Sequence, residues 1–355
     1  MNAAVHIKTI RVRVKDNHAP ILVEMARSVN TVWNYLNEIS HRSIREKGKF
    51  LSFFDMHPYT VGAAKMLGLH SHTVKRVAKA YVDNRNQFKK SKLQWRKSSG
   101  RRSLGWIPVS KGAASWKKGC IVHNGYRFKV WDSYGLEKYK FLTSSFSEDS
   151  RGRWYFNAAV EIAVTNPRGE SEIGVDLGLK TIATCSDGTR LENGRFYRNL
   201  EASLAAARRA GKKSRSRSIH AKIANQRKDA LHKFSSKLAS RCRMIVVGDI
   251  NSQKLIKTKM AKSVHDAGWF MLKTMLSYKC DHAGIVFKVV DEAYTTQTCS
   301  NCGALPDSRP KGIAGLGIRE WTCSECGVTH DRDVNAARNI LALGHERPAV
   351  GICAP

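Results

Sequence analysis

Apolar positions in the first half of the chain follow a strand period, then a helix period, then a strand period again. Residues 6–14 alternate apolar and polar side chains with one break in phase, which predicts a strand. Apolar residues recur every three or four positions from Pro20 to about Glu46 and again over 74–88, which predicts two amphipathic helices. Short alternating runs between turn signals over 106–164 predict a small antiparallel barrel. The first strand would close this barrel, and the helices would be an insertion into it.

The second half of the chain alternates strand and helix patterns after a polar segment, residues 165–172, that predicts a linker. Such alternation is typical of an α/β domain. In order, the patterns predict two strands over 173–194, helices over 196–240, a buried strand over 243–250, a helix over 266–284 and a strand over 285–292.

The 355-residue chain carries 61 lysines and arginines against 29 aspartates and glutamates, a formal net charge of +32. A surface this basic repels itself unless it binds a polyanion such as a nucleic acid. A membrane is excluded as a medium, because no apolar run approaches the roughly 20 residues that span a bilayer. The first residues also lack the pattern of a secretory signal. We therefore expect an intracellular protein, cytoplasmic and, in a bacterium, associated with the nucleoid.

Two segments place basic side chains where a nucleic-acid backbone could bind. One is helical and holds six basic residues within ten positions: Arg208, Arg209, Lys212, Lys213, Arg215 and Arg217. The other follows the second predicted helix and adds an aromatic ring: Lys89, Lys90 and Trp95. A solvated helix face is the alternative interpretation of both segments. In a chain of this charge, pairing with phosphates and stacking of bases on indole favour nucleic acid.

Asp176 lies in the strand-like segment GVDLG, where Val175 and Leu177 share one face and the carboxylate lies on the other. Gly174 and Gly178 stand two residues to either side, and they would leave room for a metal ion and a phosphate. An aspartate in a turn is the alternative, but the neighbouring residues are strand formers. We interpret Asp176 as a candidate metal ligand.

Asp333 precedes small apolar residues on one face of a predicted helix. Ala336, Ala337 and Ile340 follow it at the spacing of a single face, so the carboxylate lies at the packed edge. Burial there is costly unless a partner such as a metal pairs with the carboxylate. Asp331 lies on the other side of the axis and suits the helix cap. Mg²⁺ is held by a few such carboxylates, and two ions ~4 Å apart can promote phosphodiester hydrolysis.

Four cysteines form two closely spaced pairs: Cys299 and Cys302, then Cys323 and Cys326. This spacing matches a tetrahedral structural zinc site. Glycine follows each pair, at Gly303 and Gly327, and permits the tight turn that aims backbone N–H groups at thiolate sulfur. A redox or disulfide pair is the alternative, for which an intracellular protein has little use. Four-thiolate sites are closed, so this site indicates a scaffold and not catalysis.

The chain resembles the TnpB family of transposon-encoded RNA-guided nucleases, relatives of type V CRISPR effectors and of Fanzor proteins. The segments that carry the resemblance are GVDLGLK, the buried strand before the acidic position, and YTTQTCSNCG…WTCSECG…HDRDVNAARNI. It is specific over 171–344 and rests on layout alone over 1–170. The resemblance implies a guide RNA made from the end of the element, a short motif beside the double-stranded DNA target, and cleavage with Mg²⁺. Base pairing would read the sequence while the protein holds the backbone.

The resemblance also implies a fold class, α/β plus β-barrel. An RNase H-like (RuvC) nuclease domain would carry an inserted zinc ribbon, and an N-terminal wedge β-barrel would be interrupted by a helical recognition lobe. The implied boundaries are 1–18 and 103–168 for the barrel, 19–102 for the lobe, 171–294 and 329–344 for the nuclease domain, 295–328 for the ribbon and 345–355 for a tail.

One position departs from the family pattern. The second acidic motif of the family ends a strand in Glu-Asp-Leu, but this chain has Gly248 in place of the metal-binding glutamate, followed by Asp249. Because side chains alternate along a strand, Asp249 would face away unless a bulge rotates it. Glu292 ends the next strand, where some relatives look as though their glutamate has relocated. Strand parity does not choose between Asp291 and Glu292, and the resemblance favours Glu292 over Asp249.

The leading interpretation is an RNA-guided DNA endonuclease in which Asp176, Glu292 and Asp333 bind two Mg²⁺ ions. Gly248 leaves open a nuclease-dead, RNA-guided DNA-binding repressor. A DNA transposase of RNase H fold would also need three carboxylates. A zinc-ribbon nucleic-acid-binding protein without catalysis would leave the glycine-flanked Asp176 unexplained. The guide RNA, the flanking motif, the cut positions and the oligomeric state are not determined by the sequence.

Overall fold

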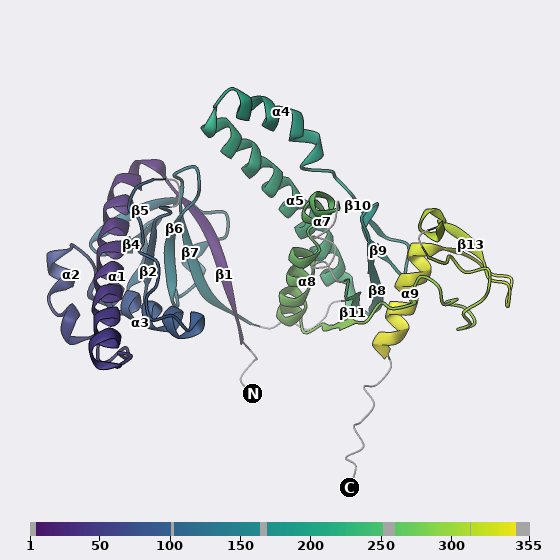
Figure 1. Ribbon diagram of the computed structural model, residues 1–355, viewed down its shortest axis with the longest axis horizontal. Coiled ribbons are helices and arrows are strands. Elements are labelled where there is room, and N and C mark those ends of the chain that lie inside the picture. Colours follow the sequence, from purple (N-terminus) through teal and green to yellow (C-terminus); the bar gives the residue numbers. More distant parts are fainter. Residues whose placement is uncertain (1–4, 101–102, 164–168, 251–259, 313, 346–355) are drawn as a thin grey trace, which may run out of the picture. The chain divides into compact units, whose positions relative to one another are not determined.

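The described polypeptide forms two compact units, which divide between Ile162 and Ala163. The structure is a computed structural model that describes residues 5–100, 103–163, 169–250, 260–312 and 314–345 (Figure 1). The first part of the expected linker and nearly all of the expected tail therefore lie outside the described residues. Within those ranges, no helix combines the length and the apolar character that crossing a membrane requires.

The N-terminal unit contains a seven-stranded sheet in the order β2-β6-β7-β1-β5-β4-β3. Its strands are β1 Val5–Val14, β2 Trp106–Val109, β3 Ala114–Lys117, β4 Cys120–His123, β5 Tyr126–Trp131, β6 Ser144–Glu148 and β7 Trp154–Ala163. β3, β4 and β5 form consecutive antiparallel hairpins, as do β6 and β7, while β2 pairs with β6. β1 lies between β7 and β5 and so joins the two halves of the sheet. The predicted strands are present, and closure of the sheet into a barrel stays a prediction.

Helices lie between β1 and β2 in the sequence: α1 Ala19–Lys47, α2 Ala63–Met66 and α3 Ser71–Phe88. Helix α1 begins beside Pro20, whose fixed φ suits a first turn, and ends at Gly48, which adopts the left-handed region at φ 63°. The apolar faces of α1 and α3 share one hydrophobic core with the sheet, in which Val29 and Tyr81 belong to the same cluster as Phe128. Both amphipathic helices are therefore confirmed as predicted.

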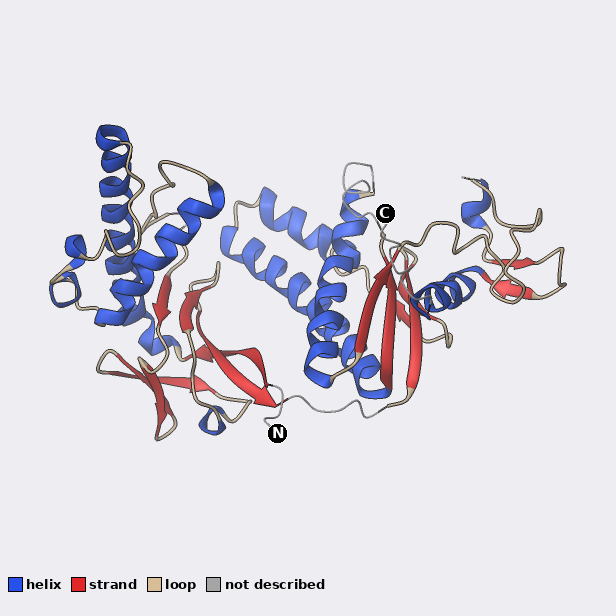
Figure 2. Ribbon diagram, turned by 90° about the horizontal axis from the view of Figure 1, so that it is seen from below, coloured by secondary structure: helices blue, strands red, loops and turns tan. Residues whose placement is uncertain are grey.

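The C-terminal unit is built on a five-stranded sheet in the order β10-β9-β8-β11-β12. Its strands are β8 Ser171–Leu177, β9 Thr181–Cys185, β10 Arg190–Glu192, β11 Cys242–Gly248 and β12 Val286–Val290. The first three strands are antiparallel, whereas β11 runs parallel to both β8 and β12. The carboxyl ends of β8, β11 and β12 therefore meet at one edge of the sheet (Figure 2). Because Ser171 already pairs with Cys242, the end of the predicted linker belongs to this sheet.

The unit contains the helices α4 Arg198–Arg209, α5 Lys213–Arg241, α7 Ala261–Ala267, α8 Trp269–Ala283 and α9 Arg332–His345. Helices α5 and α8 pack on one face of the sheet and α9 on the other, whereas α4 packs on α5. Val175 and Val247 share a core with side chains of α5 and α8. Val246 instead belongs to a cluster with Ile340 of α9. Since side chains alternate along a strand, positions 174, 176, 246 and 248 face α9.

Gly174 allows α9 to pack directly on β8. A side chain at this position would overlap the carbonyl group of Ala337 on α9 and would approach the backbone nitrogen of Leu341 to 2.8 Å. The expectation that Gly174 leaves room for a metal ion and a phosphate is therefore wrong, because a helix fills that room. The close packing brings Asp333, one turn before Ala337, towards the end of β8.

Gly268 interrupts the single helix expected over 266–284. The residue adopts the left-handed region at φ 69°, so α7 ends there and α8 begins on a new axis. Leu231 and Arg227 of α5 lie within 3.2 Å of the place of a Cβ at 268. Glycine therefore permits both the bend and the contact with α5.

The segment between β12 and α9 forms a small ribbon. Strands β13 Glu320–Thr322 and β14 Thr329–Asp331 pair antiparallel, and a 3-10 turn covers Ala314–Gly317. β14 continues directly into α9, so the ribbon is joined to the first turn of that helix.

Candidate metal centres

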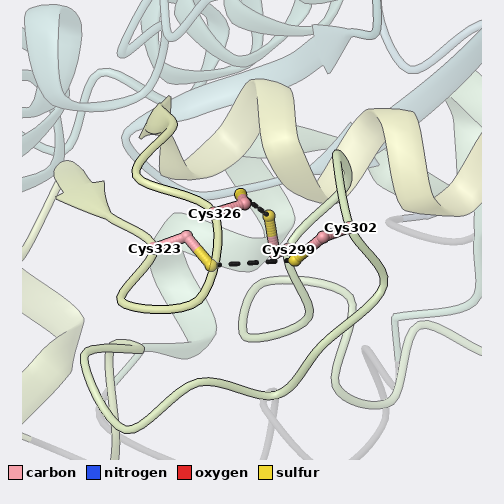
Figure 3. A group of neighbouring side chains, drawn as sticks. All are labelled: Cys299, Cys302, Cys323 and Cys326. Carbon is pink, nitrogen blue, oxygen red and sulfur yellow. Dashed lines mark hydrogen bonds between the residues drawn. The ribbon is translucent and has the colours of Figure 1, made fainter.

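The four cysteines gather at the tips of two turns in the ribbon (Figure 3). Their sulfur atoms all lie within 4.8 Å of one another, with 3.7 Å between Cys299 and Cys326 and 3.8 Å between Cys302 and Cys323. A tetrahedron with metal–sulfur bonds of about 2.3 Å has edges of about 3.8 Å. The cluster could therefore hold a metal ion in the geometry that zinc prefers, as the spacing predicted.

Backbone turns shape each half of the cluster. Gly303 and Gly327 adopt φ near 77° and 73°, and their N–H groups donate to the carbonyl groups of Cys299 and Cys323. The N–H group of Val328, aided by the side chain of Asn301, lowers the pKa of Cys326 to about 7. A thiolate is the form that binds a metal, so these donors favour the ligand state.

Helix α9 clamps the first cysteine turn. The side-chain amides of Asn335 and Asn339 each donate to the carbonyl groups of Thr295 and Thr298, at 2.7–3.2 Å. The Oδ1 atom of Asn335 accepts from the backbone of Ser300 at 2.8 Å. One buried helix face thus fixes the segment between β12 and the cysteines.

His330 links the thiol cluster to the start of α9. Its Nε2 atom lies 3.0 Å from Cys299 Sγ, and the imidazole packs against Trp321 with ring centroids 5.1 Å apart. The next residue, Asp331, caps α9 as predicted, since its carboxylate accepts from the backbone of Asp333 and Val334. Arg190 forms an ion pair with the Asp331 carboxylate, with 2.6 Å between Arg190 Nη2 and Asp331 Oδ2.

Asp176 lies near the end of β8 and faces α9. Burial, and then the neighbouring carboxylates of Asp333 and Glu292, raise the pKa of Asp176 well above its usual range. Arg332 and Arg319 oppose this shift only in part. Asp176 thus lies close enough to Asp333 and to Glu292 to be affected by both carboxylates, and a bound cation would offset that repulsion.

Gly248 leaves a space that Glu292 occupies. A Cβ at 248 would lie 2.7 Å from Glu292 Oε2, 3.2 Å from Glu292 Cβ and 3.0 Å from Ile340 Cδ1. Glu292 Oε2 is buried and has no hydrogen-bond partner in the described structure. Burial, and then the charge of Asp249, raise the pKa of Glu292. The carboxylate therefore projects where a side chain at 248 would have begun, with one oxygen available to a ligand.

Asp249 points to the other side of the sheet. Its carboxylate pairs with Lys273 of α8 at 2.7 Å, and 62% of its side chain is exposed. The strand pairing continues regularly, because Gly248 lies opposite Val290 and the Asp249 N–H donates to the carbonyl group of Val290. No bulge rotates Asp249 towards Asp176 in this part of the described sheet.

Asp333 stands in the first turn of α9 and pairs with Arg319 of the ribbon. The guanidinium lies 3.1 and 3.3 Å from the two carboxylate oxygens. Arg319 thus supplies a positive charge beside Asp333. The sequence analysis missed it, because a lone arginine before β13 carries no signal until the ribbon folds back on α9.

The three carboxylates are more widely spaced than the thiols. Among the described residues, Asp176, Glu292 and Asp333 do not form a group whose ligand atoms all lie within 4.8 Å. Two metal ions ~4 Å apart need ligands over a wider span than a single tetrahedral ion. The donor set, the unpartnered Oε2 atom and the mutual repulsion fit Mg²⁺.

The predicted basic segments are exposed in both units. Arg208, Arg209, Lys212, Lys213, Arg215 and Arg217 lie at the end of α4, in the turn and at the start of α5. Gly211 makes that turn at φ 64°, so the run forms the tip of a helical hairpin and not one helix (Figure 1). Lys89, Lys90 and Trp95 are exposed just after α3. Their contact with nucleic acid stays a prediction.

Comparison with known proteins identifies the chain. Residues 269–340 match the family described as "Cas12f1-like, TNB domain", and residues 156–259 match one described as "Probable transposase". A protein of Streptomyces pristinaespiralis named "Putative RNA-guided DNA endonuclease" is 32% identical over 284 residues, which cover 75% of this chain and 69% of that protein. The chain belongs to the TnpB family of RNA-guided nucleases.

Other TnpB relatives agree over shorter stretches. "Putative RNA-guided DNA endonuclease InsQ" of Escherichia coli is 30% identical over 57% of this chain and 56% of its own length. "CRISPR-associated endodeoxyribonuclease Cas12f1" of Sulfoacidibacillus thermotolerans is 26% identical over 62% and 57%. A solved Cas12f1–sgRNA–target DNA complex shares the fold with a TM-score of 0.58 at 13% identity, covering 92% of this chain and 83% of that one.

Proposed function

We propose that the chain is an RNA-guided, Mg²⁺-dependent DNA endonuclease of a transposable element, with Asp176, Glu292 and Asp333 as the metal ligands. The TnpB relatives support the activity, because they are named as RNA-guided DNA endonucleases. The net charge of +32 suits a guide RNA and a DNA target as partners. Such an enzyme would act where its target lies, inside the cell and, in a bacterium, at the nucleoid.

The sheet supports an RNase H-like (RuvC) nuclease domain. Three antiparallel strands are followed by two strands that run parallel to the first, in the order β10-β9-β8-β11-β12. Asp176 then lies at the end of the central strand, where ligands of open α/β sheets commonly bind. The four thiols of the ribbon would bind structural Zn²⁺, which holds the ends of β12 and α9 together.

The observation that carries the proposal is that the Glu292 side chain fills the space that glycine leaves at position 248. The glutamate fills the position that a side chain at 248 would take, and its unpartnered Oε2 atom faces the same side of the sheet as Asp176. We infer that Glu292 replaces the family glutamate and that Asp249 does not. Mg²⁺, when bound, would activate water and stabilise the leaving oxygen of a phosphodiester. The chain itself supplies three carboxyl groups for this role, near the ends of β8 and β12 and in the first turn of α9.

The test is cleavage by the full-length chain purified with RNA from the end of its element. The DNA substrate carries a matched target beside a library of flanking motifs, and the reaction contains Mg²⁺. We expect cuts that depend on the guide and are lost in Asp176→Asn, while RNA still co-purifies. Undiminished cleavage by Asp176→Asn would show that the assigned site is wrong.

Two other activities have their own outcomes in the same assay. Guide-dependent binding of target DNA without cleavage under any divalent metal would indicate a nuclease-dead repressor. Strand-transfer products would indicate a transposase, the description that one family match carries. Gly248 alone motivates the first alternative, and the filled space beside it argues for an intact site.

A further inference from the structure

The N-terminal unit contains a cleft of about 970 Å³ between α1, α3 and the segment that joins α3 to β2. Its walls include three tryptophans and one arginine, with two side-chain amides beside them: Trp33, Trp95, Trp106, Arg96, Asn84 and Gln94. The volume lies within the range of small-molecule sites. Nothing in the metal centres accounts for such a collection of aromatic and basic groups.

Asparagines on one face of α1 hold the wall of this cleft in place. Asn37 exchanges two hydrogen bonds with the backbone of Leu93, at 2.7 and 3.0 Å. Asn34 does the same with the backbone of Arg96, at 2.9 and 2.8 Å. Asn30 accepts from Arg96 Nε at 2.9 Å. The joining segment is therefore ordered before any ligand binds, which lowers the entropic cost of binding.

Arg96 is a partly buried cation whose hydrogen-bond and ring contacts are with neutral side chains, beside Lys97 in the same cleft. Its guanidinium carbon lies 5.4 Å from the ring centroid of Trp33 and 5.1 Å from that of Trp106. Its Nε atom donates to an asparagine, and the ion pairs of the described residues do not include Arg96. Burial lowers the pKa of Arg96 from its usual value. A guanidinium in this setting favours an incoming anion, and its planar donors suit a phosphate.

The tryptophans offer a ring face and an unpaired donor. Trp95 is 55% exposed although its backbone neighbours are fixed, so a flat apolar ring stands in solvent. Trp33 is 6% exposed, and its Nε1–H group is buried without a partner in the described structure. That donor is covered by protein, so the ligand class is indicated by the exposed ring of Trp95, whose flat face suits a planar group.

We propose that this cleft binds one unpaired nucleotide of a single-stranded nucleic acid, with its base stacked on Trp95 and its phosphate paired with Arg96. The amides of Asn84 and Gln94 can donate to and accept from a base edge. A base inside a duplex is covered by its neighbours, so only an unstacked base presents its face to the indole. The inference rests on the proposed function, which supplies two single strands, the guide RNA and a displaced DNA strand.

The test is photochemical crosslinking of the full-length chain to oligonucleotides of about 12 residues that contain 5-iodouracil. Single-stranded RNA, single-stranded DNA and a duplex are irradiated in a buffer without divalent metal, and the adducts are mapped by mass spectrometry. We expect an adduct at Trp95 with a single strand and little with the duplex. A stronger adduct with RNA identifies the guide as the source, and a stronger adduct with DNA identifies the displaced strand. Equal adducts with the duplex, or adducts only outside the cleft, overturn the proposal.

Matched variants separate this cleft from general electrostatic binding. Trp95→Ala should weaken single-strand binding by roughly 5- to 100-fold and abolish the adduct, whereas Trp95→Phe should keep most of the affinity. Arg96→Gln should weaken binding and reduce the salt dependence by about one phosphate contact. Trp131→Ala is the control, since that residue is 49% exposed on β5 and lies outside the cleft. Equal losses in Trp131→Ala and Trp95→Ala would contradict a specific site.

The binding test and the nuclease test fail in different ways. The Asp176→Asn protein should retain the Trp95 adduct, because the assay needs no metal. An adduct in a chain that never cleaves DNA would refute the proposed nuclease and keep the cleft. Guided cleavage that is unchanged in Trp95→Ala, together with no adduct, would refute the cleft and keep the nuclease.

Discussion

The thiol cluster and the carboxylate site share α9 but are built in opposite ways. Cys299 and Cys302 share one turn, Cys323 and Cys326 share another, and the two turns bring sulfur atoms within 3.7–3.8 Å of each other, where a backbone N–H group lowers the pKa of Cys326. The carboxylates come from two strand ends and a helix, Asp333 and Glu292 raise the pKa of the buried Asp176, and Glu292 Oε2 has no partner in the described structure. With metal bound, the first site would be closed around one ion, whereas the proposed second site would be open to ions, water and a phosphodiester.

The difference indicates which site supports the other. Asn335 and Asn339 fasten the first cysteine turn to α9, and the same turn begins directly after Glu292. The ribbon therefore restrains Glu292, which precedes it in the chain, and helix α9, which follows it. Substitutions of the cysteines should therefore disturb the positions of the carboxylates, while substitutions of the carboxylates should leave the ribbon folded.

The largest expected effect is loss of the zinc ligands. Cys323→Ser should remove the bound zinc and most of the roughly 10–16 kcal/mol that such a site contributes, so the ribbon unfolds and cleavage falls to background. Zinc content by elemental analysis and guided cleavage measure the two consequences. Cys120→Ala, a change at a buried cysteine of β4, is the control and should retain one zinc per chain. Full cleavage by zinc-free Cys323→Ser would contradict the scaffold role.

The next effect tests the carboxylate assignment without touching the ribbon. Glu292→Gln should lower guided cleavage by about a hundredfold or more, because a metal ligand is lost while the shape is kept. Asp249→Asn should stay within about threefold of the parent, since it removes an exposed ion pair with Lys273 and a charge that raises the pKa of Glu292, but no proposed metal ligand. Both variants should hold zinc normally. The reverse pattern of activities would assign the third ligand to Asp249.

A smaller effect is expected at Gly248. Gly248→Ala places a methyl group 2.7 Å from Glu292 Oε2, so the carboxylate must shift, and cleavage should fall by about tenfold. A rescue experiment sharpens the point, because Gly248→Glu combined with Glu292→Gly returns a carboxylate to the strand end. This double variant should cleave faster than Glu292→Gly alone. Cleavage by Gly248→Ala at the wild-type rate would show that the function of Glu292 does not require the space left by glycine at 248.

The smallest expected effect lies in the link between the two sites. Asn339→Ala removes two hydrogen bonds to Thr295 and Thr298, which Asn335 still contacts, so stability should fall by about 1 kcal/mol. Thermal unfolding measures the loss, and cleavage should drop only a few-fold. Asp307→Ala, at a ribbon side chain that is 98% exposed and lies away from the cysteine thiols, serves as the comparison. A loss of cleavage without a loss of stability would indicate that Asn339 acts on the substrate.

The local features of the site were predictable because they depend on neighbours in the sequence. The cysteine spacing and the following glycines predicted the thiol cluster, and the position of Asp331 predicted the cap of α9. Strand alternation also separated position 248 from Asp249, which the structure places on the α8 side. These conclusions need only the geometry of one strand, one turn or one helix.

Other features depend on packing between distant segments and could not be read locally. Gly174 was assigned to a metal and a phosphate, but α9 fills its space. The break at Gly268 depends on the close approach of α5, and Arg319 reaches Asp333 only when the ribbon folds back. A glycine or a lone arginine has no periodicity that reports such partners.

The sequence by itself determined the residue types, the cysteine spacing and the exchange of glutamate for glycine at 248. Only the tertiary structure decided that Glu292 enters the space left by Gly248, because parallel pairing of β11 and β12 and the packing of α9 bring them together. The sequence fixes which side chain stands at the end of each strand. The register of the strands and the close packing of a helix on them decide which of these side chains lie near one another.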